Sequence, residues 1–286
     1  MAEVYPRKLQ LWETWAPLRV HGTAPARLPA VPSLAQDFAA RLFAAETLQP
    51  GRSPREAVEP FTLQWYLEAE SVRYGRHGRW LPRLLEFGKH SGEMLLGLGD
   101  GLGADWVQYA RSGAQTTACC ATADAAAVIQ RNFELRGLRG RFLVADPARL
   151  PLEAASIDVV CVNDLARTAP DPAALVAEVY RVLKPGGKVL AVTAARHNVD
   201  FWARWCLPWR SLFRPGPVGG CSRRRLRRLF LRFVEHRIHK RHLRRSETPH
   251  LFRWLPLPVL ERLMGRFLIL KAFKPLSAAI SVPMAA

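Results

Sequence analysis

Two periodicities of apolar residues alternate along the middle of the chain. Apolar runs of strand length occupy residues 93–98, 115–121, 141–145, 156–163 and 188–194. Between them, apolar residues recur at helical spacing over 104–113, 123–137 and 171–183. Gly113 and Gly137 stand where the first two of these helices should end. Strands that alternate with helices predict βαβ units, and therefore an α/β fold with a mostly parallel, doubly wound sheet and helices on both faces.

The flanking segments follow different patterns. Helical patterns at 33–48 and 61–75 stand out from a stretch rich in Pro, Arg and Trp, and the segment Arg266–Phe273 has the pattern of a last strand. We therefore predict the following parts: an N-terminal helical extension or lid at 1–90, one domain at 91–275 with an aromatic segment and a basic amphipathic helix at 201–245, and a tail at 276–286.

Length and cysteine content narrow the class of protein. The 286 residues are enough for one sizeable core, and the five cysteines form no CxxC pair. We therefore expect neither a structural zinc site nor a disulfide scaffold, and a reducing cytoplasm as the compartment. The chain shows no apolar leader and no apolar run of membrane-spanning length, so neither export nor insertion into a bilayer is expected.

Charge is distributed unevenly. The net charge is +18, and residues 221–245 hold eleven Arg or Lys against the single acid Glu235. In this segment Leu226, Leu229, Phe230 and Phe233 share one helical face and arginines cover the rest. Such a cationic face is compatible with solvated surface, an anionic membrane or nucleic acid. The neighbouring tryptophans of 201–213 favour peripheral contact with a membrane over nucleic acid.

One short segment is a candidate binding turn. The sequence LLGLGDGLG at 95–103 places glycines at 97, 99, 101 and 103, directly after a predicted strand and before a predicted helix. In an open parallel sheet, ligands bind at the carboxyl ends of the strands, where the backbone must approach them closely. Gly99, Gly101 and Ala104 also satisfy GxGxxA, which is typical of dinucleotide binding. The acid expected about twenty residues later is missing, because that position falls at Cys119 and Cys120.

Three longer stretches carry a resemblance. GLGDGLGADWVQYARSGA, LVADPARLPLEAASIDVV and PDPAALVAEVYRVLKPGGKVLAV, with RVLKPGG as the most specific element, resemble class I S-adenosylmethionine-dependent methyltransferases. The most similar group includes enzymes of ubiquinone and menaquinone biosynthesis. The resemblance covers residues 92–195 and implies S-adenosylmethionine as cofactor.

The resemblance also implies roles for individual residues. The positions that would bind the cofactor are Gly97, Gly99, Gly101, Gly103, Cys120, Asp146, Pro147 and Asn163. Two of them depart from the family pattern, because Gly97 and Cys120 stand where relatives carry acids. Each lost charged hydrogen bond would weaken binding by about 1.5–3 kcal/mol. Asp100, Asp105 and Asp124 are the nearby acids that could substitute.

The chemistry of methyl transfer requires alignment of donor and acceptor, and a base only if the acceptor loses a proton. Asp164, after the strand at 156–163, is the candidate catalytic base, although capping a loop is an equally ordinary role for it. The histidines of 236–250 have no clustered acids or cysteines, so no metal site is expected. The predicted function is methyl transfer to a small lipophilic acceptor. The alternatives are a catalytically silent scaffold and, on GxGxxA alone, an NAD(P)-dependent oxidoreductase.

Overall fold

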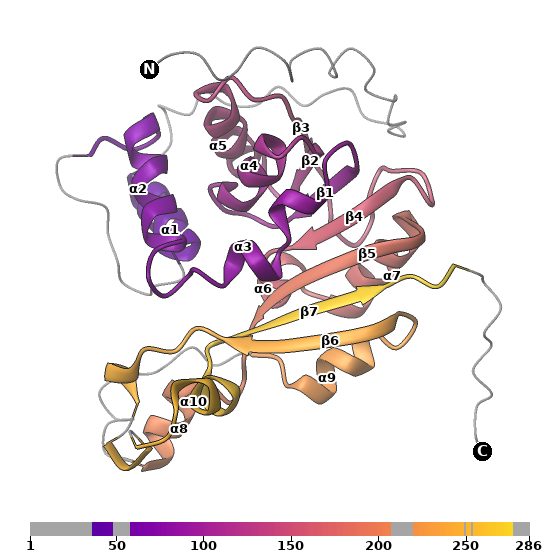
Figure 1. Ribbon diagram of the computed structural model, residues 1–286. Coiled ribbons are helices and arrows are strands. Elements are labelled where there is room, and N and C mark those ends of the chain that lie inside the picture. Colours follow the sequence, from indigo (N-terminus) through magenta and orange to yellow (C-terminus); the bar gives the residue numbers. More distant parts are fainter. Residues whose placement is uncertain (1–35, 48–57, 207–219, 249, 253, 277–286) are drawn as a thin grey trace, which may run out of the picture.

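A single seven-stranded sheet organises the chain. The computed structural model describes residues 36–47, 58–206, 220–248, 250–252 and 254–276, and its strands lie in the order β3-β2-β1-β4-β5-β7-β6 (Figure 1). The strands are β1 Met94–Leu98, β2 Gln115–Cys120, β3 Arg141–Val144, β4 Ile157–Val162, β5 Leu183–Ala194, β6 Val234–Arg241 and β7 Phe267–Phe273. The first five pair in parallel, and β7 runs antiparallel to both β5 and β6. The predicted mostly parallel, doubly wound sheet is confirmed.

Helices cover both faces of this sheet. The longer ones between the strands are α4 Ala104–Arg111, α5 Ala123–Glu134 and α7 Pro172–Val182. Each of the last two begins at a polar cap: the Thr122 hydroxyl accepts a hydrogen bond from the Ala125 N–H, and the Asp171 carboxylate accepts one from the Ala173 N–H. Gly113 and Gly137 adopt positive φ angles of 93° and 61° just after α4 and α5, as their spacing predicted.

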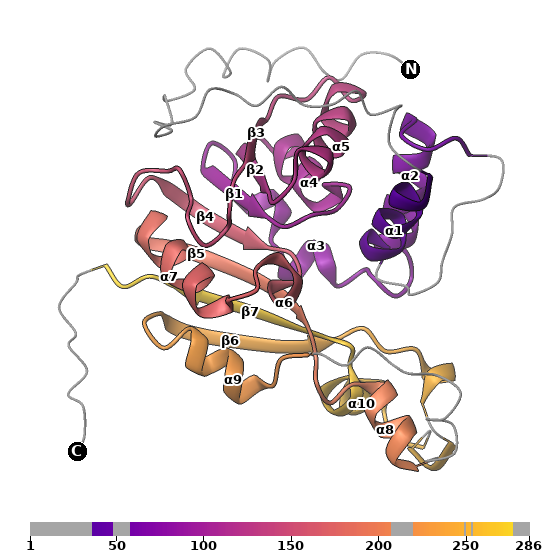
Figure 2. The same ribbon diagram turned by 180° about the vertical axis from the view of Figure 1, so that it is seen from behind.

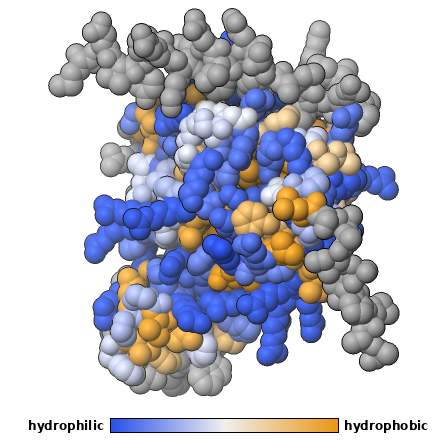
Figure 3. Space-filling model, turned by 45° about the vertical axis from the view of Figure 1, so that its right-hand side comes forward, coloured by the Kyte–Doolittle hydropathy of each residue, from blue (hydrophilic) through white to orange (hydrophobic). Residues whose placement is uncertain are grey.

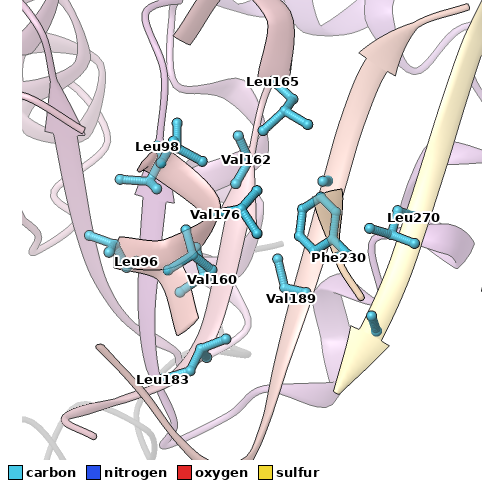
Figure 4. Packing of buried hydrophobic residues seen from close by; sticks show 14 of the residues in the cluster. Leu96, Leu98, Val160, Val162, Leu165, Val176, Leu183, Val189, Phe230 and Leu270 are labelled. Carbon is cyan, nitrogen blue, oxygen red and sulfur yellow. The ribbon is translucent and has the colours of Figure 1, made fainter. Parts of the chain in front are cut away.

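The two faces of the sheet use alternate residues of each strand. Leu96 and Leu98 of β1 pack in the cluster that includes α7, whereas Leu95 packs in the cluster with α4 and α5. The α7 side is completed by Phe230, at the end of helix α9 Arg223–Leu229 (Figure 4). Both sides of the parallel strands are therefore buried, which explains their continuous apolar runs.

The N-terminal helices lie on the α4–α5 side of the molecule (Figures 1 and 2). They are α1 Gln36–Glu46, α2 Leu63–Arg73, α3 Leu81–Leu84 and the short η3 Phe87–Lys89. A third core cluster joins them to the domain, because Phe43 and Trp65 pack in it together with Leu102 and Val128. The Tyr66 hydroxyl also donates to the Val128 carbonyl at 2.8 Å.

The C-terminal part differs from expectation in one respect. The basic segment 221–245 is predicted as one helix, but α9 ends at Leu229 and residues 234–241 form the edge strand β6. The prediction failed because β6 pairs with β7, and this pairing across 26 or more residues leaves no local signal. The remaining elements of this part are α8 Val199–Cys206, η5 Arg245–Glu247, η6 His250–Phe252 and α10 Leu257–Met264; the short α6 Leu165–Thr168 lies between β4 and α7.

The KPGG part of the RVLKPGG element belongs to β5 and is irregular, because the pairing of β5 with β4 skips from Leu183 to Lys188. Much of the aromatic segment lies outside the described residues, since 207–219 are not among them. Among the helices of the described residues, none combines the length and apolar character needed to span a bilayer.

Candidate functional site

The predicted binding residues gather at the carboxyl edge of the parallel strands. The turn at 97–103, called the glycine turn below, links β1 to α4. Its Gly99 N–H donates to the Cys119 carbonyl at 3.3 Å, and the Asn163 N–H donates to the Leu98 carbonyl at 2.9 Å. The ends of β1, β2 and β4 are thus joined directly. This is the edge at which open α/β sheets bind their ligands.

Protein atoms already explain why this turn needs glycines. A side chain at Gly97 would overlap the Trp106 indole of α4, and a Cβ at Gly101 would lie 2.5 Å from the Glu46 Oε2. Gly99 and Gly103 have φ angles of 126° and 71°, which other residues adopt only with strain. The acid that the resemblance implies at position 97 therefore has no room in this chain.

A carboxylate from the N-terminal helices lies on the glycine turn. The Leu102 N–H donates to the Glu46 Oε2 at 2.9 Å, and the Glu46 side chain is buried. Burial raises the pKa of this carboxyl, which hydrogen bonds from the backbone at Leu102 and Ala104 oppose. Because helix N-termini favour anions, Glu46 fills the position in which α4 would otherwise receive an external anionic group.

Behind this carboxylate lies a buried ionic network. Arg73 donates through Nε to Asp105 Oδ1 at 2.9 Å and through Nη2 to Asp105 Oδ2, and its Nη1 donates to the Glu46 carbonyl at 2.6 Å. The Tyr74 hydroxyl donates to Asp105 Oδ1 at 2.8 Å. Burial alone would lower the pKa of Arg73, but Asp105 and Glu46 raise it well above its usual value. Asp105 is thus committed to Arg73, and the expectation that it could substitute for a missing binding acid is wrong.

Cys120 lies at the end of β2 and is fully buried. Its sulfur points to the Gly99 carbonyl at 3.8 Å, and burial raises the pKa of the thiol well above its usual range. The side chain is therefore a small neutral group that contributes no charge to the site.

Asp100 supplies a carboxylate at this same position. It is exposed in the glycine turn, and its Oδ1 accepts a hydrogen bond from the Ala121 N–H at 3.3 Å. Ala121 directly follows Cys120, so the carboxylate lies at the end of β2, where the resemblance implies an acid. Asp124 is also exposed but lies within the first turn of α5.

Asp146 and Pro147 follow β3 at the same edge of the sheet. Asp146 is exposed, and its Oδ1 accepts from the Ala148 N–H at 2.8 Å, which closes a local turn. Pro147 is buried beside it. The Ala145 N–H donates to the Cys120 carbonyl at 3.0 Å, which connects this loop to the end of β2.

Asn163 and Asp164 continue β4 into α6. Asp164 has a left-handed backbone with φ 54°, and its carbonyl accepts from the N–H groups of Arg167 and Thr168 at 2.8 and 3.0 Å. Its carboxylate lies 4.0 Å from the Arg167 Nε and is half-buried. The backbone of Asp164 therefore begins a short helix, while its carboxylate remains at the carboxyl edge of the sheet.

Glu46 and Arg73 are the site residues that sequence reasoning missed. They belong to different helices: Glu46 contacts the glycine turn at Leu102, 56 residues later in the chain, and Arg73 binds Asp105 and the Glu46 carbonyl. Neither stands in a motif. An acid at the end of an amphipathic helix and an arginine at the end of the next are ordinary surface positions until the helices pack.

The chain is similar to known proteins in sequence and in fold. Residues 95–191 match a family described as a methyltransferase domain. A demethylmenaquinone methyltransferase of Thermus thermophilus is 30% identical over 124 residues, which are 42% of this chain and 56% of that protein. Another, from Lactococcus lactis, is 41% identical over 61 residues, which are 21% and 24% of the two chains. The chain thus matches about half, or less, of the length of these relatives.

Solved structures share the fold. A geranyl diphosphate C-methyltransferase from Streptomyces coelicolor A3(2) superposes with a TM-score of 0.53 at 16% identity, covering 86% of this chain and all (100%) of that one. The 4+2 cyclase SpnF superposes with a TM-score of 0.52 at 18% identity, covering 84% and 94%. At these identities the likeness concerns the fold, which can carry different chemistries.

Proposed function

We propose that the chain is a class I S-adenosylmethionine-dependent methyltransferase that transfers a methyl group to a small lipophilic acceptor; the match of residues 95–191 to a family described as a methyltransferase domain supports this. The observation that carries the proposal is the Glu46 carboxylate on the glycine turn. S-adenosylmethionine is cationic at its sulfonium and its ammonium group, so a carboxylate at this position favours it. The pyrophosphate of a dinucleotide would meet the same carboxylate, which argues against an NAD(P)-dependent oxidoreductase.

The chain offers a consistent set of groups for this cofactor. Backbone atoms of the glycine turn would lie beneath its methionine part, and the exposed Asp146 carboxylate would accept from its adenine amino group. Pro147 and Asn163 would line the same edge. Asp100 would bind the ribose hydroxyls in place of Cys120, because its carboxylate already lies at the end of β2.

We assign Asp164 the role of base for an acceptor that loses a proton. Its half-buried carboxylate lies at the end of β4, beside the glycine turn. S-adenosylmethionine supplies an electrophilic methyl group when bound; the residues of the chain would orient the acceptor and exclude water. The names of the Thermus and Lactococcus relatives support a quinone-like acceptor.

A catalytically silent scaffold is the second candidate. It is favoured by the loss of both family acids, since Gly97 has no space for a side chain and Cys120 is buried and neutral. The two candidates differ in a simple observable. An enzyme must bind the cofactor at micromolar concentration, and a scaffold need not bind it.

Calorimetric titration with S-adenosylmethionine and S-adenosylhomocysteine tests the proposal. We expect micromolar binding, weakened about 10- to 100-fold in Asp100→Asn by loss of a charged hydrogen bond. Asp124→Asn is the matched control, and its affinity should change less than about threefold. If Asp124→Asn lost as much affinity as Asp100→Asn, Asp100 alone would not be the ribose ligand, and α5 would also contact the ribose. If the wild type did not bind at millimolar ligand, the methyltransferase proposal would be excluded and the catalytically silent scaffold would be the function that is left.

We also propose that residues 221–245 make peripheral contact with an anionic membrane, where a lipophilic acceptor would be dissolved. The eleven basic residues of this segment support the contact. Each basic side chain near an anionic surface contributes about 1 kcal/mol.

A further inference from the structure

A groove between α7 and α9 lies on the opposite face of the sheet from α4 and α5. Its volume is about 250 Å³. Val176, Tyr180 and Phe233 form an apolar floor, and Arg225, Arg228 and Arg232 form the rim. We call it the arginine groove. It shares no residue with the glycine turn, so it is a separate site.

The charge of the arginine groove is one-sided. No aspartate or glutamate is among the residues that line it. Arg225, Arg228 and Arg232 are exposed; the first two share one side of α9, and Arg232 lies in the turn just after this helix. Guanidinium groups match phosphate oxygens in shape and remain charged at every physiological pH. The groove therefore fits a phosphate group attached to an apolar body.

Exposed apolar side chains flank this rim. Leu231, which lies after α9 and directly before Arg232 in the chain, is 70% exposed, and Val234 at the start of β6 is also exposed. The Arg223 Nη2 donates to the Arg262 carbonyl at 3.5 Å, which joins α9 to α10. Leu263, next to Arg262 in α10, is exposed, and Trp254, between η6 and α10 along the chain, is 78% exposed. The space-filling view shows blue side chains across the lower part of the molecule beside an orange patch on its lower lobe (Figure 3).

This combination favours a membrane over a nucleic acid. Arginines beside exposed aliphatic side chains such as Leu231 are typical of surfaces that enter the interface of a bilayer. Single-stranded nucleic acids instead need aromatic faces on which bases can stack. In the arginine groove, the Tyr180 ring is already covered by Arg232 at 4.3 Å and Lys274 at 4.7 Å, and Phe233 meets its edge.

We propose that the arginine groove binds the phosphate of an anionic phospholipid headgroup and so holds the chain on the membrane, with Leu231 inserted between lipids. The inference rests on the proposed membrane contact of 221–245 and assigns it a specific site. It places the main contact on α7 and α9 rather than along the whole basic segment.

Vesicle sedimentation of the full chain tests the site. The probes are vesicles of phosphatidylcholine mixed with phosphatidylglycerol, and vesicles of phosphatidylcholine alone. We expect binding to the mixed vesicles, weakened about a hundredfold when Arg225, Arg228 and Arg232 are all changed to Gln. The control changes Arg79, Arg83 and Arg139 to Gln, which removes the same charge from exposed positions elsewhere. Its binding should fall less than about threefold.

Several outcomes would overturn the proposal, and each excludes a different part of it: the headgroup site, the membrane contact or the lipid as ligand. An equal loss in both triple variants would leave general membrane attraction but no headgroup site. No binding of the wild type to mixed vesicles would remove the membrane contact itself. Release from vesicles by inorganic phosphate at low millimolar concentration would assign the groove to a free phosphate ligand. Binding of single-stranded RNA but not of vesicles would assign it to nucleic acid. Cofactor titration of the same variants shows whether the proposed methyl-transfer site is intact in each case.

Discussion

Charged side chains cluster both beside the glycine turn and in the arginine groove, but they are buried and paired in the first region and exposed in the second. Beside the glycine turn, Glu46, Arg73 and Asp105 are buried and bonded to one another. In the arginine groove, three arginines are exposed and no carboxylate lines the site. Buried charges must be paired because their desolvation is costly, whereas exposed charges can remain open to a partner. The charges beside the glycine turn therefore stabilise the fold, whereas the charges of the arginine groove are accessible to a binding partner.

Removal of a buried charge should have the largest effect. Arg73→Met leaves Glu46 and Asp105 buried without their counter-ion, and we expect a loss of about 3–5 kcal/mol in the free energy of unfolding. Arg228→Gln in the arginine groove is the contrasting variant and should change it by less than about 0.5 kcal/mol. Urea unfolding of the two variants measures the difference. Similar losses in both would show that the two regions do not differ in this way.

Glu86 is an intermediate case that sharpens the comparison. Burial alone would raise the pKa of this carboxyl, but hydrogen bonds from Lys188, Lys271 and Lys89 lower it from 4.5 to about 2. Because the folded-state pKa is the lower one, the stabilisation is complete above pH 4.5 and is lost as the pH falls through about 2. Glu86→Gln should cost about 2–3 kcal/mol at pH 7 and nearly nothing at the acid end. Urea unfolding across this pH range tests it; a cost independent of pH would contradict the pairing.

The packing of the glycine turn gives the smallest expected effect. Gly97→Ala places a methyl group into the Trp106 indole, and overpacking of this kind costs about 1–3 kcal/mol. Gly88→Ala is the matched control, because no atom lies within 4 Å of its added Cβ and no positive φ opposes it. Thermal unfolding of both variants is the measurement. An unchanged midpoint for Gly97→Ala would mean that Trp106 can move aside and that position 97 could again hold an acid.

The order of the middle of the chain was predictable because its signals are local. Strand and helix periodicities, the glycines after α4 and α5, and the alternation of elements follow from neighbouring residues alone. The same holds for the glycine turn, whose position between a strand and a helix is visible in the sequence. The strand β6 was missed because its pairing with β7 depends on residues far away in the chain.

What the sequence by itself determined is the class of fold, the place of the glycine turn and the absence of two family acids. Only the tertiary structure showed what lies at the two positions. The Trp106 indole fills the space at Gly97, and Asp100 reaches the end of β2 beside Cys120. Glu46 reaches the turn only because α1 and α2 pack on the domain. Local periodicity is a property of neighbouring residues. The pairing of buried charges, in contrast, requires distant segments to pack together and exclude water.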